Sequence, residues 1–514
     1  MLHILPPELS LNVLSYLPIP SLLPLSSLSH QWLDFLFVNQ SKIFKSAALL
    51  HEFIPPGTLL LEDALSMYTG NPWEGSMDWK DFCRRSFHLR KNWEGKGRAV
   101  ARLLSPPGSD VHRIKVDERA GICITTHMFG GLSVNHLFSS ILLWRLPPSY
   151  VHRYAHCEYE KGYLVFDQLD GQKDVWCLAG DFTEGEVATY SPPDDEQRRI
   201  SALSAAKYRQ YAPRGQFRPW AKLSFPEITR AYRLAYPTLV CASDEHAFLH
   251  DIRTGALVQT VYIHLSGVCY VDVNERHVIV CEQNAVHVFS RRDNAKVLCI
   301  SKDVPVLCSQ LVEDPKLVPG NPFVTPLSLS PDPDDFRTGF VAAHVSRDGR
   351  DLAVMAFRRR ILLIRDFERI CRGETSLESS GLVLRIRRED ICCYLGFEHG
   401  RICVATLLGL YVFTIGSDLS ADAAFVQPYS NPSHVAHKIS CMQLTDRRIY
   451  FTWENARRRD VPLFQDGEDD DEQLSPSVTP PIVDPLVEAL VADRFELPEG
   501  NSVGCIDFSF LPES

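Results

Sequence analysis

The chain has 514 residues, of which 45% are hydrophobic and 23% charged, a composition typical of a soluble globular protein with two or three domains. The formal net charge of −11, from 53 basic and 64 acidic residues, argues against nucleic acid as a partner. No run approaches the roughly 18 apolar residues of a membrane span, and the start lacks a basic region with a cleavage site. We therefore expect no membrane association and a cytoplasmic or nuclear location, or both.

The N-terminal segment predicts three short, leucine-rich helices. Pro7 and Glu8 suit the first turn of a helix, Pro18 and Pro20 end it, and Ser21 can cap the next one. Leu9, Val13, Leu14 and Leu17 recur at three-to-four-residue spacing and are expected on one face of the first helix. The apolar positions of the other two helices are Leu22, Leu25 and Leu28, then Trp32, Phe35 and Leu36. Such short helices cannot bury all these side chains against one another, so the segment needs a partner, either the rest of the chain or a second protein.

The order of these residues over positions 2–48 resembles an F-box. The matching motifs are Leu5-Pro6-Pro7-Glu8-Leu9, then Leu14-Ser15-Tyr16-Leu17-Pro18, a leucine-rich middle and Trp32. Ser29-His30-Gln31 departs from the family, which usually has a more basic, cysteine-containing run there. The resemblance implies docking on the Skp adaptor of a cullin–RING ubiquitin ligase. The residues implied in adaptor binding are Leu5, Pro6, Leu9, Leu14, Leu17, Leu22, Leu25 and Trp32. The plain alternative is a helical cap packed on its own domain.

Residues 49–103 predict a helical linker. One helix is expected around Leu59–Tyr68, after a Pro-Pro-Gly break, and a longer one begins near Trp79 with basic residues opposite an apolar stripe. The ending Asn92-Trp93, followed by glycine, resembles the helix that joins an F-box to a WD-repeat propeller. Any amphipathic helix between two domains would show the same stripe.

From about Val111 the helical pattern gives way to short β-branched and aromatic runs between turns. Each cluster supplies two strands that pair and a third strand after a turn, and the clusters recur at about 40–50 residues, the size of a propeller blade. The clusters are Val111–Trp144, Tyr150–Cys177, Thr238–Val261, Val268–Ile300, Phe340–Ile370, Cys392–Ile415 and Ile439–Trp453 with the C-terminal tail. We therefore predict an all-β propeller over residues 104–456, with seven blades as the best fit and six or eight as alternatives.

One cluster resembles the end of a WD repeat. An apolar strand ends at His250-Asp251 and turns through Thr254-Gly255 into the next strand, where Asp can accept backbone N–H groups and Gly can adopt positive φ. His250-Asp251 and Arg365-Asp366 stand where the family has Trp-Asp, and its Gly-His pair is not evident. The repeats are therefore degenerate.

The last strand is expected to close the ring. Residues 501–512 alternate as a strand and follow residues 457–500, whose acidic run Asp466–Glu472 and prolines predict a mobile loop. A second insertion is predicted for Pro192–Pro237, with helical character around Ser201–Tyr211.

No catalytic motif is evident. The sequence lacks a phosphate-binding glycine loop, a nucleophile elbow and paired histidines, and the acids around Asp332 fit a turn. The 15 cysteines are scattered without C-x-x-C spacing, which predicts reduced, buried thiols and neither metal nor cofactor. Arginine runs at 358–360, 387–388 and 457–459 are expected to be exposed. In related receptors such arginines bind phosphorylated peptides, but the spacing here aligns none of them with that role.

Together the resemblances imply a non-catalytic substrate receptor of an SCF-type ligase, which binds the Skp adaptor and a cullin through the F-box and a protein target of unknown identity through the propeller. One alternative is an adaptor-binding scaffold that does not promote degradation. The other is a propeller enzyme, for which acids or histidines converging in the central channel would be the sign.

Overall fold

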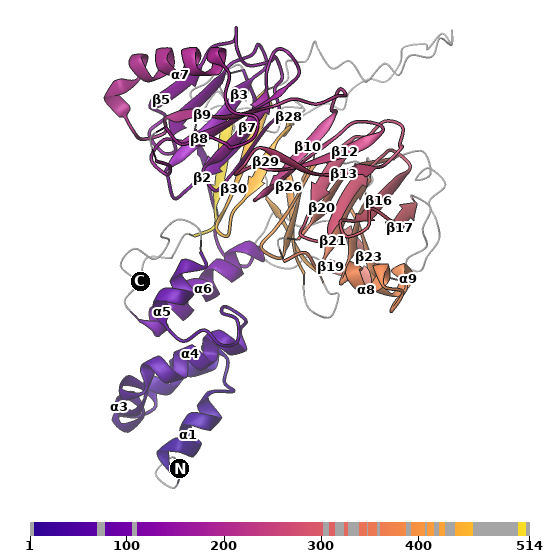
Figure 1. Cartoon of the computed structure of the whole chain (residues 1–514). Coiled ribbons are helices and arrows are strands. Elements are labelled where there is room, and N and C mark those ends of the chain that lie inside the picture. The colour runs from indigo at the N-terminus through magenta and orange to yellow at the C-terminus, as the bar shows by residue number, and fades with distance from the viewer. Residues whose placement is uncertain are drawn as a thin grey trace, which may run out of the picture.

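A computed structural model describes residues 5–68, 78–104, 110–183, 185–301, 308–313, 323–326, 339–346, 348–356, 360–386, 392–406, 409–415, 421–426, 437–455 and 502–509. Within these ranges a helical arm leads into a ring of seven β-sheets, and Figure 1 shows α1 at the far end of the arm and α6 next to the ring. The predicted loop at 457–500, the acids at 332–335 and the arginines at 358–359, 387–388 and 457–459 lie outside the described residues.

The arm is built from short helices. They are α1 (Pro7–Leu14), α2 (Ile19–Leu22), the 3₁₀ helix η2 (Leu23–Ser27), α3 (His30–Val38), α4 (Gln40–Leu50), α5 (Leu61–Ser66) and α6 (Trp79–Trp93). The second helix starts at Ile19, two residues before the predicted cap Ser21, because Pro20 is tolerated in a first turn, where its missing N–H has no partner to lose. Ser29 caps α3, its hydroxyl accepting the N–H of Trp32 at 3.3 Å.

These helices share one hydrophobic core. Its buried members are Leu14, Ile19, Leu22, Leu36, Ile43, Phe44, Ala47, Ala48, Ile54, Ala64, Trp79, Phe82 and Cys83. The first half of α6 belongs to this core, and the thiol of Cys83 donates a hydrogen bond to the carbonyl of Phe44 at 3.0 Å. The helices from α1 to the first half of α6 therefore form a single packed unit.

Six of the seven blades contain a meander of four strands, one more than the sequence predicts. Blade one is β2 (Val111–Asp117), β3 (Ile122–His127), β4 (Leu132–His136) and β5 (Leu142–Leu146); blade two is β6 (Cys157–Glu160), β7 (Tyr163–Asp167), β8 (Lys173–Leu178) and β9 (Phe217–Leu223); blade three is β10 (Ala231–Ala235), β11 (Thr238–Ala242), β12 (His246–Asp251) and β13 (Ala256–Tyr262). Blade four is β14 (Tyr270–Val273), β15 (His277–Cys281), β16 (Ala285–Ser290) and β17 (Lys296–Ser301); blade five is β20 (Phe340–Val345), β21 (Leu352–Ala356), β22 (Arg360–Ile364) and β23 (Gly381–Arg385); blade six is β24 (Cys392–Glu398), β25 (Arg401–Thr406), β26 (Leu410–Ile415) and β27 (Ala421–Val426). The seventh blade combines strands that are far apart in the sequence. The prediction of an all-α F-box region followed by a seven-bladed propeller is confirmed.

The seventh blade joins the first and the last strand of the described chain. Its strands are β28 (His437–Lys438), β29 (Met442–Leu444), β30 (Arg448–Asn455), β31 (Ser502–Asp507) and β1 (Val100–Leu103). β31 pairs antiparallel with β30 on one side and with β1 on the other. Val100–Leu103, which the sequence places in the helical linker, is thus the outermost strand of this blade.

The second insertion is shorter than predicted. β9 and β10 fall within Pro192–Pro237, so that only the segment between β8 and β9 is inserted, with α7 (Asp195–Lys207) and η3 (Arg209–Tyr211). Pro219 is the reason that β9 is not predicted, because proline in a sequence argues against a strand. In the structure Pro219 lies opposite Trp176 beside a register shift, in an outer strand where a missing N–H is tolerated.

The fifth blade has additions at its edge. β18 (Cys308–Glu313) pairs parallel with β23, and β19 (Phe323–Pro326) pairs with β18. Two short helices, α8 (Phe367–Cys371) and α9 (Leu377–Ser380), connect β22 to β23.

The middle strands of the blades are buried on both faces, as their unbroken apolar runs require. All five residues of β11 and of β15 are buried, whereas the outer strand β13 is mostly exposed. The prediction of buried thiols is wrong for Cys269 and Cys299, which are exposed.

Candidate adaptor-docking surface and propeller channel

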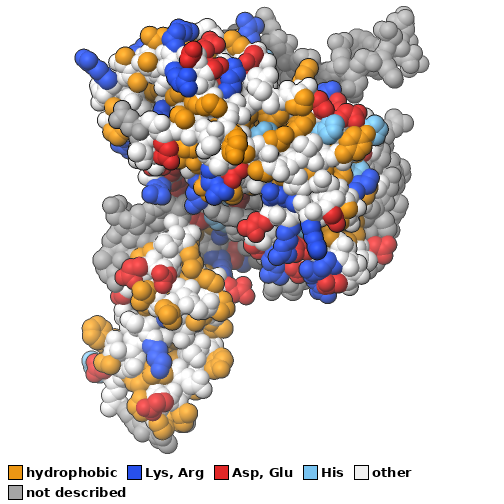
Figure 2. All heavy atoms as spheres, in the orientation of Figure 1, with side chains coloured by type: hydrophobic (Ala, Val, Ile, Leu, Met, Phe, Trp, Pro, Cys, Tyr) orange, Lys and Arg blue, Asp and Glu red, His pale blue; other side chains and the backbone are white. Residues whose placement is uncertain are grey.

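The arm exposes apolar side chains that a self-contained domain would bury, and Figure 2 shows them along its visible face. The large exposed apolar residues of the arm are Leu5, Leu9, Val13, Tyr16, Leu28, Leu33, Phe37, Val38, Leu49, Leu50, Leu59, Leu60 and Met67. Exposed apolar surface on this scale marks an interaction site.

α1 has two apolar faces. Leu9 and Val13, four residues apart on one side of the helix, are 50% and 55% exposed. Ser10 and Leu14, also four residues apart, are buried against the rest of the arm. The sequence places Leu9 and Leu14 on one face, and this prediction is wrong, because Leu14 serves the arm's own core while Leu9 faces solvent.

α3 repeats this arrangement. Leu36 is buried in the arm's core, whereas Leu33, Phe37 and Val38 are 47%, 77% and 79% exposed. Leu33 and Phe37 are four residues apart and share a face. Leu33 and Phe37 are not among the site residues predicted from the sequence, although their spacing is a signal for them.

The eight residues implied in adaptor binding divide by exposure. Leu5, Pro6 and Leu9 are exposed, and Leu17, Leu25 and Trp32 are partly buried against the arm's core. Leu14 and Leu22 are only 2% and 1% exposed, so they stabilise the module instead of presenting surface to a partner.

α6 connects this module to the propeller. Trp93, at its end, is 1% exposed and its ring stacks on Phe508 with centroids 3.8 Å apart. The indole N–H donates to the carbonyl of Asp446 at 3.0 Å, and the guanidinium of Arg401 lies 4.6 Å from the ring centroid. Burial lowers the pKa of Arg401 to about 10. Trp93 therefore fastens the arm to blades six and seven.

Asn92 fixes the turn that follows α6. Its side-chain amide donates to the carbonyl of Phe508 at 2.6 Å, and its Oδ1 accepts the N–H of Arg98 at 3.0 Å. A Cβ on Gly97 would lie 1.9 Å from that oxygen, so glycine is needed there. The first half of α6 packs in the arm's core and Leu89 and Trp93 pack in the propeller's, which makes this helix of about 22 Å a strut between them.

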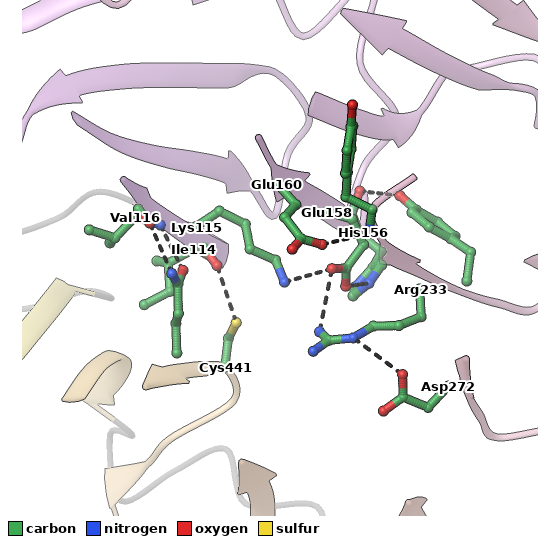
Figure 3. Close-up of polar contacts among 12 residues, drawn as sticks. Ile114, Lys115, Val116, His156, Glu158, Glu160, Arg233, Asp272 and Cys441 are labelled. Carbon is green, nitrogen blue, oxygen red and sulfur yellow. Dashed lines mark hydrogen bonds and ion pairs between the residues drawn. The ribbon is translucent and has the colours of Figure 1, made fainter. Parts of the chain in front are cut away.

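A network of alternating charges lines the centre of the ring (Figure 3). The Nζ of Lys115 lies 2.9 Å from Glu158, whose carboxylate lies 3.4 Å from Arg233. Arg233 lies 3.8 Å from Asp272, and Asp272 lies 3.4 Å from His344. The five residues come from the first strands of blades one to five, so each of these contacts joins two neighbouring blades.

The carboxylate of Glu158 stays ionised in this network. Burial opposes its charge, but Lys115 and Arg233 outweigh that effect and hold the pKa of Glu158 well below its ordinary value. His156 also contacts Glu158, with Nε2 2.9 Å from the carboxylate.

Acids and histidines thus do converge at the centre of the ring, which is the sign expected of a propeller enzyme. Each has a partner in the structure, however: Asp272 accepts the N–H of Val345 at 3.0 Å, and a ring nitrogen of His344 lies 3.0 Å from the hydroxyl of Tyr270. In the described residues no group of three or more His, Cys, Asp and Glu side chains could hold a metal ion. The network fits a role in holding blades together.

The end of the ring away from α6 exposes large apolar side chains. α6 contacts Asp446, in the turn between the first and second strands of blade seven. Because neighbouring strands of a blade are antiparallel, the loops after each second and each fourth strand lie at the opposite end of the ring. Phe129, Tyr154 and Ile228 lie in such loops and are 64%, 57% and 90% exposed. The N–H of Gly131 donates to the carbonyl of Val151 at 3.3 Å, and this hydrogen bond connects two of these loops.

The geometry defines a protein-interaction architecture, in which a helical module with an apolar outer surface is held by a strut on a β-propeller. The family model of the F-box domain matches residues 2–37, which contain α1 to η2 and most of α3. The chain therefore carries an F-box domain, which implies binding to the Skp adaptor of an SCF ligase. A search of curated proteins returns no match to the chain. Among the described residues, none of the helices has the length and apolar character to cross a membrane.

Proposed function

We propose that the protein is a substrate-recognition subunit of an SCF-type cullin–RING ubiquitin ligase. The observation that supports this most is the outward apolar face of α1 and α3, within the residues that match the F-box, joined by α6 to a propeller. The F-box binds the adaptor and through it the cullin, and the propeller binds a protein target.

The protein acts by proximity and supplies no catalytic group. A target bound to the propeller has its lysines held near the conjugating enzyme of the assembled ligase, which raises their effective concentration. The strut favours this role, because a rigid helix of about 22 Å fixes the distance between adaptor and target where a flexible linker would not.

The target binds the end of the ring away from the arm. Phe129, Tyr154 and Ile228 offer exposed apolar side chains there, and exposed aromatic side chains are typical anchors in protein interfaces. No disulfide joins the described cysteines, which suits the reducing cytoplasm or nucleus, where we place the protein.

Affinity purification tests the docking surface. Leu9→Asp with Val13→Asp puts charge on the outer face of α1 without touching the arm's core, so we expect the tagged variant to lose the adaptor and the cullin. The matched control is Leu203→Asp with Leu257→Asp on the propeller, where the leucines are 58% and 53% exposed and adaptor recovery should equal that of the wild type. Equal recovery from the F-box variant and the control would show that α1 does not dock the adaptor.

Target abundance separates a ligase receptor from an adaptor-binding scaffold. Proteins that co-purify with the F-box variant as well as with the wild type are target candidates. On deletion of the gene a target of a ligase accumulates, and only the intact F-box reverses this. A target whose abundance follows neither change favours the scaffold.

A further inference from the structure

Two cysteines of blade four lie together, where the first strand of the blade begins and its second strand ends. Cys269 immediately precedes β14, and Cys281 is the last residue of β15. Their sulfur atoms are 3.6 Å apart, and the N–H of Cys269 donates to the carbonyl of Cys281 at 3.0 Å. The backbone hydrogen bond fixes the two residues side by side, so a modest rotation of the side chains brings the sulfurs to the bonding distance of about 2.05 Å.

The two thiols differ in access to solvent. Cys269 is exposed, whereas Cys281 is fully buried in the core shared by blades four and five. The hydrogen bond between the two thiols lowers the pKa of Cys269, and the same contact together with burial raises the pKa of Cys281. Solvent access and a lowered pKa favour reaction of a cysteine, and Cys269 has both, with a second thiol behind it.

We propose that Cys269 and Cys281 are an oxidation site that forms an intramolecular disulfide with a hydroperoxide as oxidant. The Cys269 thiolate attacks the outer peroxide oxygen, the O–O bond breaks, and the alkoxide or hydroxide that leaves takes up the proton of the Cys269 thiol. Cys269 is then a sulfenic acid. The sulfur of Cys281 displaces its hydroxyl, which leaves as water with the proton of Cys281. Two thiols lose two electrons in total, and one peroxide is reduced.

The disulfide would form at the end of the ring that we assign to the target. β14 begins at that end, because it is a first strand, and the Cys269 sulfur lies 3.6 Å from the carbonyl of Phe340 in blade five. The next residue, Tyr270, contacts His344 of the charge network. Oxidation therefore locks the loop that precedes β14 at the seam between blades four and five.

The sequence makes the test direct, since trypsin cleaves after Arg253, Arg276 and Arg291 and leaves each cysteine alone in its own peptide. The purified full-length chain is treated with hydrogen peroxide, its remaining thiols are alkylated, and the non-reduced digest is analysed by mass spectrometry. We expect peptides 254–276 and 277–291 joined and lighter by two hydrogens, with the alkylated forms restored by dithiothreitol.

Cys299 on β17 is the internal control, because it is a second exposed thiol. Cys281→Ser should leave Cys269 as a sulfenic acid that dimedone traps, and Cys269→Ser should leave Cys281 unmodified in the folded protein. If peroxide oxidises Cys299 while Cys269 and Cys281 both stay alkylated, the proposal is wrong. It is also wrong if the joined peptides appear only after unfolding in urea. Neither outcome bears on adaptor binding, which the F-box variants test separately.

Discussion

His250, in the middle of the third blade, shows how one buried side chain makes stability depend on pH. The residue is 5% exposed, its ring packs 5.2 Å from that of Phe225, and burial lowers its pKa to about 4. In the unfolded chain the pKa returns to about 6.5, so the unfolded state binds the proton first as the pH falls. The folded protein therefore loses stability between about pH 6.5 and 4.

Replacing the imidazole of His250 should reduce the dependence of folding stability on pH. From pH 7 to pH 5 the wild type should lose about 1–2 kcal/mol of unfolding free energy through His250. His250→Phe keeps an aromatic ring beside Phe225 and removes the titration, so its loss should be smaller by that amount. Urea unfolding of both proteins at the two pH values measures it. Equal losses would mean that His250 titrates alike in the folded and unfolded chains.

α6 is the element on which the relation between the two domains depends. Trp93 packs on the propeller, and the fully buried Phe82, eleven residues earlier, packs on the arm. Because both ends are buried, a change at one end should affect both the propeller and the position of the arm.

Trp93→Ala should separate the arm from the ring. The substitution removes a fully buried ring and its hydrogen bond to Asp446, which should cost about 3–5 kcal/mol of local stability. We expect proteolysis between α6 and β1 to become much faster, while adaptor binding persists because the arm keeps its own core. Arg84→Ala, on the exposed side of α6, is the control. Unchanged proteolysis in Trp93→Ala would contradict the role of the strut.

Elements with local signals could be predicted from the sequence, and those set by distant partners could not. The stripe of α6 and its terminal Trp93 are local, and both appear in the expected place. β9 and β10 were missed because Pro219 and a polar surrounding hide strands that pairing with β8 and β11 defines. Leu9 and Leu14 were assigned to one face because helical spacing alone does not say which side of α1 meets a core.

The candidate site shows the same division. Leu5, Pro6 and Leu9 follow from the F-box motif and are exposed in the structure. The charge network could not be foreseen, since Lys115 and Glu158 are 43 positions apart and only ring closure brings their strands together. The Cys269–Cys281 pair has no motif spacing and exists only through the pairing of β14 with β15.

At the scale of the whole molecule, an ionic cluster closes the ring between blades one and seven. Glu118, in the turn after β2, accepts hydrogen bonds from Arg447 at 2.6 Å and Arg448 at 3.2 Å. The hydroxyl of Tyr450 also donates to Glu118, at 2.8 Å, and Arg448 reaches Asp507 of β31 at 2.8 Å. The side chain of Glu118 is only 3% exposed, so solvent screens these contacts little.

Glu118→Gln should weaken the closed ring. It removes the buried charge that Arg447 and Arg448 share, although Arg448 keeps Asp507, and this should cost about 2–4 kcal/mol. The urea midpoint should fall, and hydrogen exchange should rise first in β30 and β31. Glu196→Gln on α7, whose carboxylate is 53% exposed beside Arg199, should change little. Equal urea midpoints for the two variants would show that the Glu118 cluster does not stabilise the closed ring.

The seventh blade also sets an order of events during synthesis. Its outer strand, Val100–Leu103, leaves the ribosome about 400 residues before its partner, Ser502–Asp507, is made. The F-box can therefore fold and bind its adaptor before the seventh blade is complete and the ring is closed. A chain released before residue 502 would dock on the ligase without a finished platform for a target. We expect such truncated products to compete with the full-length receptor for the adaptor, and not merely to be inactive.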